Sequence, residues 1–336
     1  MQLGATPRRA GAALALAAAL GGGCASREPD RITVGIAPQP SVGLVLIAEA
    51  KGLFRDQGLV VEQRRFGSGR DACAALGRGE VDAAVAFETP VILGASVDPG
   101  LKVLTMLHGS SRSTRIVARA DRGIRRDVDL AGKRVGVPRN TNAEAFLDAL
   151  LQYGAVPRPA VEIVDVDPGA AADLLAAGGV DAIAIWPPHA ERARRLLGAD
   201  HVVEIATDVY TEVSMLVTRD AVLADRRRTL AKLVRALSDA ERLVRERPEE
   251  AFEALAAALP DPPRADLREA WDRVRPGVGV SHLLAHVLET EWDRLRAEGR
   301  LSGPFDIAAV LESGILAEVD PEAVTFVLPP RRARAR

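Results

Sequence analysis

The sequence predicts an α/β protein of two similar lobes that face a common cleft, and an internal repeat is the main reason. Residues 75–90 read ALGRGEVDAAVAFETP, and residues 174–188 read LLAAGGVDAIAIWPP. Both stretches predict a glycine-containing turn, a short apolar strand and an aromatic residue at the strand end. At an offset of 99 residues the repeat matches Gly79 with Gly178, Asp82 with Asp181, and Phe87 with Trp186.

Two further matches extend the repeat upstream in the same order. Residues 34–36 (VGI) match residues 135–137 (VGV) at an offset of 101, and residues 61–62 match 161–162 at an offset of 100. Three matched places at a nearly constant offset indicate one α/β unit used twice. Strands that alternate with helices through short loops favour parallel βαβ units in each copy.

Length and composition fit a globular protein of about two domains. The chain has 336 residues, 48% of them hydrophobic, and a formal net charge of −2 with both signs mixed. Without a basic stripe and interleaved aromatic residues, nucleic acid is not an expected partner. The sequence holds no HExxH, GxSxG or P-loop motif, and His282 and His286 have metal-ligand spacing without a third ligand. We expect no metal, no cofactor and no catalytic residue.

The N-terminus is typical of an export signal. Arg8 and Arg9 precede an apolar run over residues 10–20, which is too short to span a bilayer and suits a signal peptide over residues 1–23. Small residues before Cys24 resemble a bacterial lipobox, although Gly21 stands where an aliphatic residue is expected. Cys24 is therefore the expected lipid attachment site, with residues 24–30 as a tether; simple secretion is the alternative.

The first lobe is expected over residues 31–116 and 218–330. Pro38 and Pro40 should end its first strand, and Ser41 should cap the helix over residues 42–51. Gly67-Ser68-Gly69 should form a loop before the helix over residues 70–76. The expected strands are residues 32–37, 59–65, 83–87 and 102–107.

The second lobe is expected over residues 117–217. Asn140-Thr141-Asn142 should cap the helix over residues 143–153. Two crossing strands, over residues 114–120 and 213–218, should form a hinge. The other expected strands are residues 133–137, 161–166, 182–185 and 202–205, and the other helices are residues 169–177 and 190–197.

The remainder of the chain has a helical pattern. Apolar residues recur with a period of 3.6 over residues 223–246, and Pro248 should end that helix. We expect the C-terminal helices to pack on the first lobe and residues 331–336 to be a disordered basic tail. The further helices expected are residues 249–258, 265–274, 281–298 and 307–316.

Three segments resemble one known family. Residues 48–62 (AEAKGLFRDQGLVVE), 130–140 (LAGKRVGVPRN) and 180–188 are similar to segments of the substrate-binding proteins of nitrate, sulfonate and taurine ABC importers. The resemblance covers about residues 32–217. It implies a type II periplasmic-binding-protein fold, in which two α/β lobes joined by a two-strand hinge close over a small molecule.

The resemblance also implies a function and partners. The protein would be an exported, lipid-anchored, monomeric solute-binding protein that delivers a small organic molecule to an ABC permease and its ATPase. It would be periplasmic or lie on the outer face of the cell membrane, and it would not be an enzyme. Three alternatives stay open: a protein that binds thiamine pyrimidine precursors, an enzyme on the same fold, and a ligand-sensing partner of a membrane receptor.

Ligands of parallel α/β sheets bind beyond the carboxyl ends of the strands. The repeat locates those ends in both lobes, and helix N-termini at Ser41, Ser68 and residues 140–142 suit an anionic group. Ordinary helix capping is the alternative. The expected ligand-binding residues are Gln39, Pro40, Ser41, Gly67, Ser68, Gly69, Phe87, Glu88, Thr89, Asn140, Thr141, Asn142 and Trp186.

Four side chains refine the expected ligand. Trp186 should flank its organic part, with the indole N–H as a donor. Glu88 opposes a bare anion such as nitrate and favours a ligand that also carries a positive or donating group, although it could simply cap the following helix. Arg70 and Arg139 flank the cleft loops as candidate anion contacts, with solvated helix-start arginines as the alternative.

Overall fold

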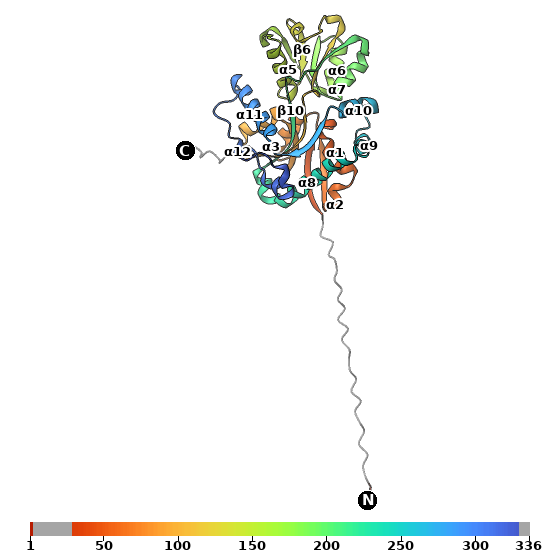
Figure 1. Cartoon of the computed structure of the whole chain (residues 1–336), viewed down its shortest axis with the longest axis vertical. Coiled ribbons are helices and arrows are strands. Elements are labelled where there is room, and N and C mark those ends of the chain that lie inside the picture. Colours follow the sequence, from red (N-terminus) through yellow and green to blue (C-terminus); the bar gives the residue numbers. More distant parts are fainter. Residues whose placement is uncertain (3–28, 329–336) are drawn as a thin grey trace.

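The structure is a computed structural model, and it describes residues 1–2 and 29–328. Two sheets lie in two lobes, one above the other in Figure 1. Each lobe has its own apolar core, and the two clusters share no residue. The expected fold class, two α/β lobes with the C-terminal helices on the first, is confirmed.

The first sheet has six strands in the order β11-β4-β10-β3-β1-β2. β1 pairs in parallel with β2 and β3, whereas β10 runs antiparallel to both β3 and β4. The strands are β1 (Asp30–Ile36), β2 (Leu59–Arg65), β3 (Ala83–Phe87), β4 (Leu101–Ser110), β10 (Glu212–Arg219) and β11 (Arg275–Gly279).

The second sheet repeats this arrangement in the order β7-β6-β8-β5-β9. β6 is parallel to β7 and β8, and β5 is antiparallel to β8 and β9. By position in the sheets, β6 corresponds to β1, β7 to β2 and β8 to β3. In the same way, β5 corresponds to β10 and β9 to β4. The strands are β5 (Arg115–Arg119), β6 (Arg134–Val137), β7 (Glu162–Asp165), β8 (Ala182–Ile185) and β9 (Val202–Ile205).

The repeated glycine and aspartate have the same geometry in both lobes. Gly79 and Gly178 each have a φ of 74°, in the left-handed region that favours glycine. The Asp82 carboxylate accepts the backbone N–H of Thr33 at 2.9 Å, and Asp181 accepts that of Arg134 at 2.9 Å. Each aspartate therefore holds the equivalent parallel strand, β1 or β6, and the sequence repeat reflects one supersecondary unit used twice.

Helices flank the first sheet in two groups. α8 packs on β11, β10 and β4, and α1, α2 and α9 pack against α8. α3 and α4 pack against β3, and α11 packs against α4. The helices of this lobe are α1 (Gly43–Ala50), α2 (Leu53–Asp56), α3 (Gly69–Gly77), α4 (Glu88–Val97), α8 (Asp220–Glu246), α9 (Pro248–Ala258), α10 (Arg264–Trp271), α11 (His282–Ala297), α12 (Ile307–Val310) and α13 (Gly314–Val319).

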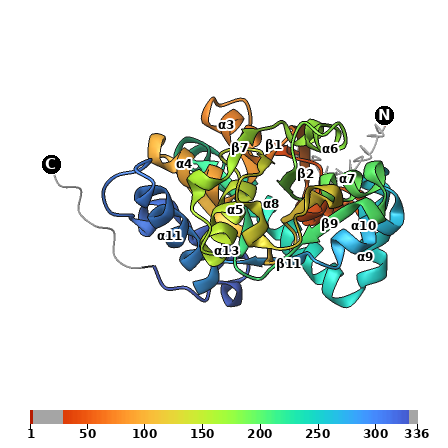
Figure 2. The same ribbon diagram turned by 90° about the horizontal axis from the view of Figure 1, so that it is seen from above.

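The second lobe carries three α-helices among the described residues. They are α5 (Asn142–Tyr153), α6 (Pro168–Ala176) and α7 (His189–Leu197). α6 and α7 pack against each other, and α5 packs against β8 and β5. Viewed from above, α5 lies near α11 whereas α7 lies near α10 (Figure 2). Both of these partner helices belong to the first lobe.

The chain crosses between the lobes twice, and the crossings lie beside the expected strands. β5 belongs wholly to the second sheet and β10 wholly to the first, so the crossings are residues 111–114 and 206–211. The expected lobe boundaries, after residues 116 and 217, fall inside β5 and β10. The alternating pattern located the strands, but only their pairing partners show where the chain changes lobe.

The C-terminal part contains one strand that the helical pattern did not predict. β11 pairs antiparallel with β4 at the edge of the first sheet, and its register is interrupted between Pro276 and Gly279. Such an irregular edge strand with proline and two glycines lacks the alternation by which strands are recognised. The expected signal peptide beyond residue 2, the expected lipid site Cys24 and the expected tail at 331–336 lie outside the described residues. Among the described residues, no helix is long and apolar enough to cross a membrane.

The repeated turn predicts a stability difference between two neighbouring glycines. Gly79→Ala should lower the free energy of unfolding by about 1–2 kcal/mol, because a side chain disfavours the left-handed backbone. Gly77, which ends α3, has open space where a Cβ would lie and no positive φ. Gly77→Ala is the matched control and should leave stability unchanged or raise it slightly. Denaturant unfolding measures both, and equal effects would contradict the backbone argument.

Candidate functional site

A small cavity lies between the lobes where the strand ends of both sheets meet. Its volume is about 10 Å³, which is room for roughly one water molecule. Both lobes contribute side chains, so the site exists only when they are together. The lining residues are Gln39, Ser68, Gly69, Arg70, Phe87, Pro90, Thr141, Asn142 and Trp186.

On the first lobe, α3 begins at the cavity. Ser68 is its N-cap and accepts the backbone N–H of Asp71 at 3.2 Å, while its hydroxyl donates to the Asp71 carboxylate at 2.7 Å. Gly69 follows, and a Cβ there would lie 3.1 Å from Cα of Ala86. This tight fit requires glycine because a larger residue would push the helix start away from β3.

On the second lobe, α5 begins at the cavity. Thr141 is the N-cap: its oxygen accepts the N–H of Ala143 at 3.3 Å, and its hydroxyl donates to the carbonyl of Pro138 at 2.6 Å. The capping expected at residues 140–142 is therefore made by Thr141. Asn140 has a φ of 61°, a left-handed conformation that asparagine tolerates better than most residues. Its N–H donates to Glu144 at 2.8 Å.

Asn142 connects the cavity to both crossings. Its side-chain amide donates to Glu212 at 2.8 Å and to the hydroxyl of Thr114 at 2.9 Å. Thr114 ends one crossing and Glu212 follows the other. Glu212 is buried, and His108 Nε2 lies 3.5 Å from its second oxygen. A displacement of the first turn of α5 would therefore disturb hydrogen bonds at both points where the chain passes between the lobes.

Phe87 and Trp186 face the cavity from equivalent strand ends. Phe87 packs edge-on against His108 at 6.0 Å between ring centroids, and Trp186 packs edge-on against His189 at 6.1 Å. Burial lowers the pKa of His189 to about 4. Trp186 is only 4% exposed, and its indole Nε1 has no hydrogen-bond partner. A buried donor without an acceptor is rare in folded proteins, so this N–H marks where an acceptor group of a ligand would be stabilised.

Ser41 does not cap a helix, contrary to expectation. Its hydroxyl accepts the Gln39 side-chain amide at 2.8 Å, and its carbonyl accepts the Ser214 hydroxyl at 3.3 Å. The chain forms a 3₁₀ turn over Pro40–Val42 before α1, with no side-chain cap at either start. Gln39, and not Ser41, lines the cavity.

Glu88 points away from the cleft cavity. Its carboxylate accepts the hydroxyl of Tyr210 and the N–H of Val213, the latter at 2.9 Å. Burial raises the pKa of Glu88 well above its ordinary value, and the nearby Glu291 carboxylate adds to this. The residue helps to fasten α4 to the second crossing. The expected contact between Glu88 and a cleft ligand does not fit this placement.

The structure brings together seven of the thirteen expected residues. Arg70 also lines the cavity, although the sequence placed it only at the flank, and Pro90 was not among the expected residues. The strand-end pattern gave positions in the chain but not side-chain directions, which explains why the expected residues and the cavity lining differ. The expected residues that do not line the cavity are Pro40, Ser41, Gly67, Glu88, Thr89 and Asn140.

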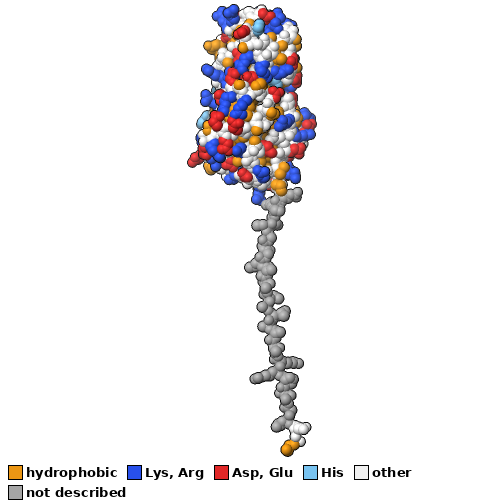
Figure 3. Space-filling view, turned by 90° about the vertical axis from the view of Figure 1, so that its right-hand side faces the viewer, with side chains coloured by type: hydrophobic (Ala, Val, Ile, Leu, Met, Phe, Trp, Pro, Cys, Tyr) orange, Lys and Arg blue, Asp and Glu red, His pale blue; other side chains and the backbone are white. Residues whose placement is uncertain are grey.

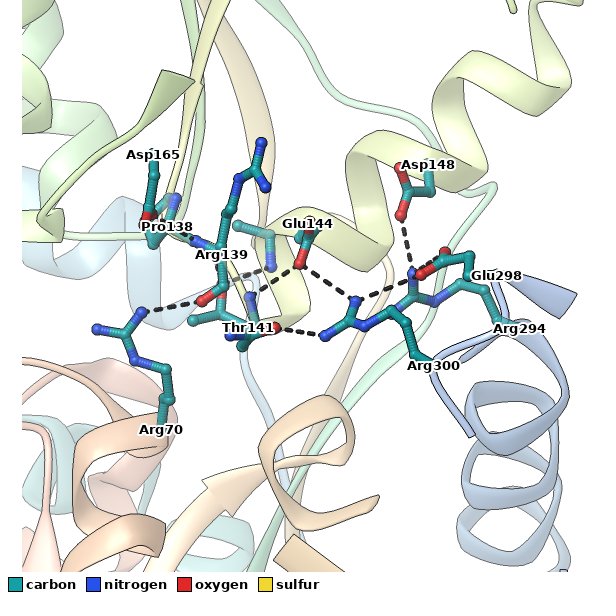
Figure 4. A network of polar contacts seen from close by, with 12 residues as sticks. Arg70, Pro138, Arg139, Thr141, Glu144, Asp148, Asp165, Arg294, Glu298 and Arg300 are labelled. Carbon is teal, nitrogen blue, oxygen red and sulfur yellow. Dashed lines mark hydrogen bonds and ion pairs between the residues drawn. The ribbon is translucent and has the colours of Figure 1, made fainter. Parts of the chain in front are cut away.

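Charged contacts hold the lobes together on the α11 side (Figure 4). Arg70 donates to the backbone carbonyl of Arg139 at 2.9 Å across the mouth of the cleft. Arg294 of α11 pairs with Asp148 of α5 at 2.8 Å. Arg300 bonds the side chain of Asn140 and lies 3.6 Å from Glu144. The first lobe thus supplies the cations and the second lobe most of the acceptors.

A second group of contacts holds the lobes together on the α10 side. Arg194 of α7 pairs with Glu269 of α10 at 2.7 Å, and Arg195 pairs with Asp266. Arg273 lies 3.7 Å from the buried Glu191.

Figure 3 shows this side of the molecule, where acidic and basic side chains alternate over both lobes without a large field of one sign. The structure therefore represents a closed arrangement.

A larger cavity of about 820 Å³ lies on the flank between α5 and α11. Its wall includes Glu88, Tyr210 and Arg294. Although its volume is typical of ligand pockets, it lies beside the helices and not at the strand ends. The cleft cavity holds the unpaired indole and the helix N-termini of both lobes, and we take it as the candidate site. No cluster of three potential metal ligands occurs among residues 29–328.

Two curated relatives are binding proteins by name. The chain is 27% identical over 234 residues to a Brucella abortus (strain 2308) protein that is provisionally named a binding protein, covering 67% of this chain and 70% of the relative. It is 28% identical over 162 residues to the taurine-binding periplasmic protein of Escherichia coli (strain K12), covering 48% and 50%.

Solved structures share the fold at low sequence identity. The alkanesulfonate-binding protein SsuA from Xanthomonas axonopodis pv. citri, bound to MOPS, superposes with a TM-score of 0.72 at 18% identity, covering 85% of this chain and 99% of that one. The desulfurization enzyme DSZB superposes with a TM-score of 0.64 at 18% identity, covering 86% and 98%. The fold therefore occurs in both binding proteins and an enzyme.

The sequence resemblance to sulfonate- and taurine-binding proteins is confirmed by these relatives. The family model described as NMT1/THI5 like matches residues 39–251, more than half of the chain. The chain belongs to the NMT1/THI5-like family.

Proposed function

We propose that the protein is an exported solute-binding protein that delivers a small organic anion, of the sulfonate type, to an ABC importer. The proposal rests on one observation above all: the buried indole N–H of Trp186 lacks an acceptor and lines a cavity between two lobes. The N-caps Ser68 and Thr141 place two helix starts around the same cavity, and helix starts stabilise anions.

The names of the relatives support this ligand class. The sulfonate group combines a negative charge with three acceptor oxygens, which matches a site that offers donors. The permease and its ATPase are the partners that this function requires.

An enzyme on the same fold is the main rival, because DSZB shares the architecture. The cavity wall holds one hydroxyl-bearing residue on each lobe, Ser68 and Thr141, and both oxygens accept helix-capping bonds. No histidine, cysteine or carboxylate lines the cavity to act as base or nucleophile. The lining therefore favours binding over catalysis.

The closed arrangement implies that a ligand enters an open one. A cavity of about 10 Å³ is too small for a sulfonate, so the lobes must separate about residues 111–114 and 206–211 and close again. Ion pairs at the lobe edges would set the balance between the two states.

Ligand affinity should depend on the Trp186 indole N–H. Trp186→Phe keeps an aromatic ring but removes the donor, and it should weaken propanesulfonate binding by about 2 kcal/mol, the usual size for a hydrogen bond to a charged group. Trp292, whose indole donates to the carbonyl of Gly303, is remote from the cleft cavity. Trp292→Phe is therefore the matched control for calorimetry. Unchanged binding in Trp186→Phe would remove the main support for the proposed site.

Opening should become easier when an interlobe ion pair is removed. Arg294→Gln should raise the open fraction of the ligand-free protein about fivefold, if the Arg294–Asp148 pair contributes about 1 kcal/mol to closure. Arg296→Gln is the control, since Arg296 pairs with Asp293 on its own helix. Fluorescence energy transfer between the lobes would measure the change. The same distance distribution in both variants would show that this pair does not hold the lobes closed.

Anchoring should depend on Cys24. If a lipid is attached there, Cys24→Ala should move the protein from the membrane fraction to the soluble fraction, because acyl chains provide the attachment. Fractionation and intact mass of the mature wild type would test this. A wild-type mass without lipid, together with an unchanged location of the variant, would exclude the lipoprotein assignment.

A further inference from the structure

We propose that the cleft selects anions that carry no ammonium group, so that it binds alkanesulfonates with neutral tails and rejects their zwitterionic amino analogues. This inference rests on the proposed function and narrows its ligand class. It also reverses the sequence-based expectation of a ligand with a positive or donating end near Glu88.

The cavity wall contains one charged side chain, Arg70, and no carboxylate. The other lining residues are neutral. An ammonium group buried here would lose its water without gaining an anionic partner, which is costly. A sulfonate, in contrast, gains the indole N–H of Trp186 and the guanidinium of Arg70.

Carboxylates near the first-lobe side of the cleft are already bound within the protein. Asp71 accepts the Ser68 hydroxyl at 2.7 Å and Arg70 Nε at 3.1 Å. Glu88 accepts from Tyr210 and Val213, and it faces the flank cavity. Neither carboxylate lines the cleft cavity.

The same holds on the second-lobe side. Asp165 accepts the N–H of Arg139 at 3.2 Å, and Asp167 caps α6 through Gly169 at 2.8 Å. Glu144 is paired with Arg158 at 2.9 Å and with Arg300 at 3.6 Å. These acids serve helix starts and lobe contacts.

Glu212 does not line the cavity but is bonded to Asn142, which does. Its oxygens face the Asn142 amide, the Thr114 hydroxyl and His108. Since the Asn142 amide nitrogen is committed to Glu212, the floor presents a neutral amide and not the carboxylate. A ligand ammonium would therefore meet only neutral acceptors.

Arg70 is the cation that would meet the anion. It is the second residue of α3, where its Nε pairs with Asp71 at 3.1 Å, and it reaches across the mouth to the carbonyl of Arg139. Figure 4 shows the guanidinium of Arg139 turned away from Arg70, and Arg139 does not line the cavity. The two arginines therefore offer a matched pair, one in the site and one beside it.

The test compares three sulfonates of nearly equal size. Propanesulfonate, isethionate and taurine differ only in a terminal methyl, hydroxyl or ammonium group. Calorimetry on the full mature protein should show that propanesulfonate and isethionate bind at least tenfold more tightly than taurine. Arg70→Gln should weaken propanesulfonate about tenfold or more, whereas Arg139→Gln should change it less than twofold.

A gain-of-function variant tests the cause. Gln39→Glu puts a carboxylate of the same shape on the cavity wall, and at pH 8 it should shift the ratio of affinities toward taurine about tenfold. An unchanged ratio would show that the missing carboxylate is not the reason for rejection.

The remaining outcomes separate this inference from the proposed function. Taurine binding as tight as isethionate binding to the wild type would overturn the inference and leave the proposed function standing. Binding of none of the three sulfonates would overturn the proposed ligand class and the inference with it.

Discussion

The buried carboxylate of Glu212 is the interaction on which the two-lobe arrangement depends. It lies where β10 begins after the second crossing, and it accepts from Thr114, at the end of the first crossing, and from Asn142, at the start of α5. A buried carboxylate is stable only when donors surround it. Here the donors come from the first crossing and from the second lobe, while Glu212 itself belongs to the first sheet, so satisfying one charge fixes the position of the first crossing and of the cleft floor together.

The contacts at the edges of the lobes differ in kind from the lobe cores. Each core is a separate apolar cluster, whereas the lobes meet through arginine–carboxylate pairs such as Arg294–Asp148 and Arg194–Glu269. Partly exposed ion pairs contribute modestly and are weakened by salt. An interface of this kind can open without unfolding either lobe, which is what a protein that takes up and releases a ligand requires.

The internal repeat was the most informative feature of the sequence. It predicted two α/β units and the equivalence of Phe87 with Trp186, because each unit needs a glycine in the left-handed region and an aspartate that accepts a backbone N–H of the adjacent parallel strand. It did not predict β11, whose proline and glycines hide the strand pattern. The lobe boundaries expected after residues 116 and 217 fall inside β5 and β10, because the alternation within these strands does not reveal their pairing partners.

The sequence by itself determined the fold class, the order of the strands in each unit and the loops that surround the cleft. Only the tertiary structure decided which side chains of those loops face the ligand cavity. Phe87 faces the cavity whereas Glu88, the next residue, faces Tyr210 and the second crossing. Phe87 ends β3 and Glu88 begins α4, so the two side chains leave the backbone in different directions, and only the elements packed around them determine which one becomes part of the binding surface.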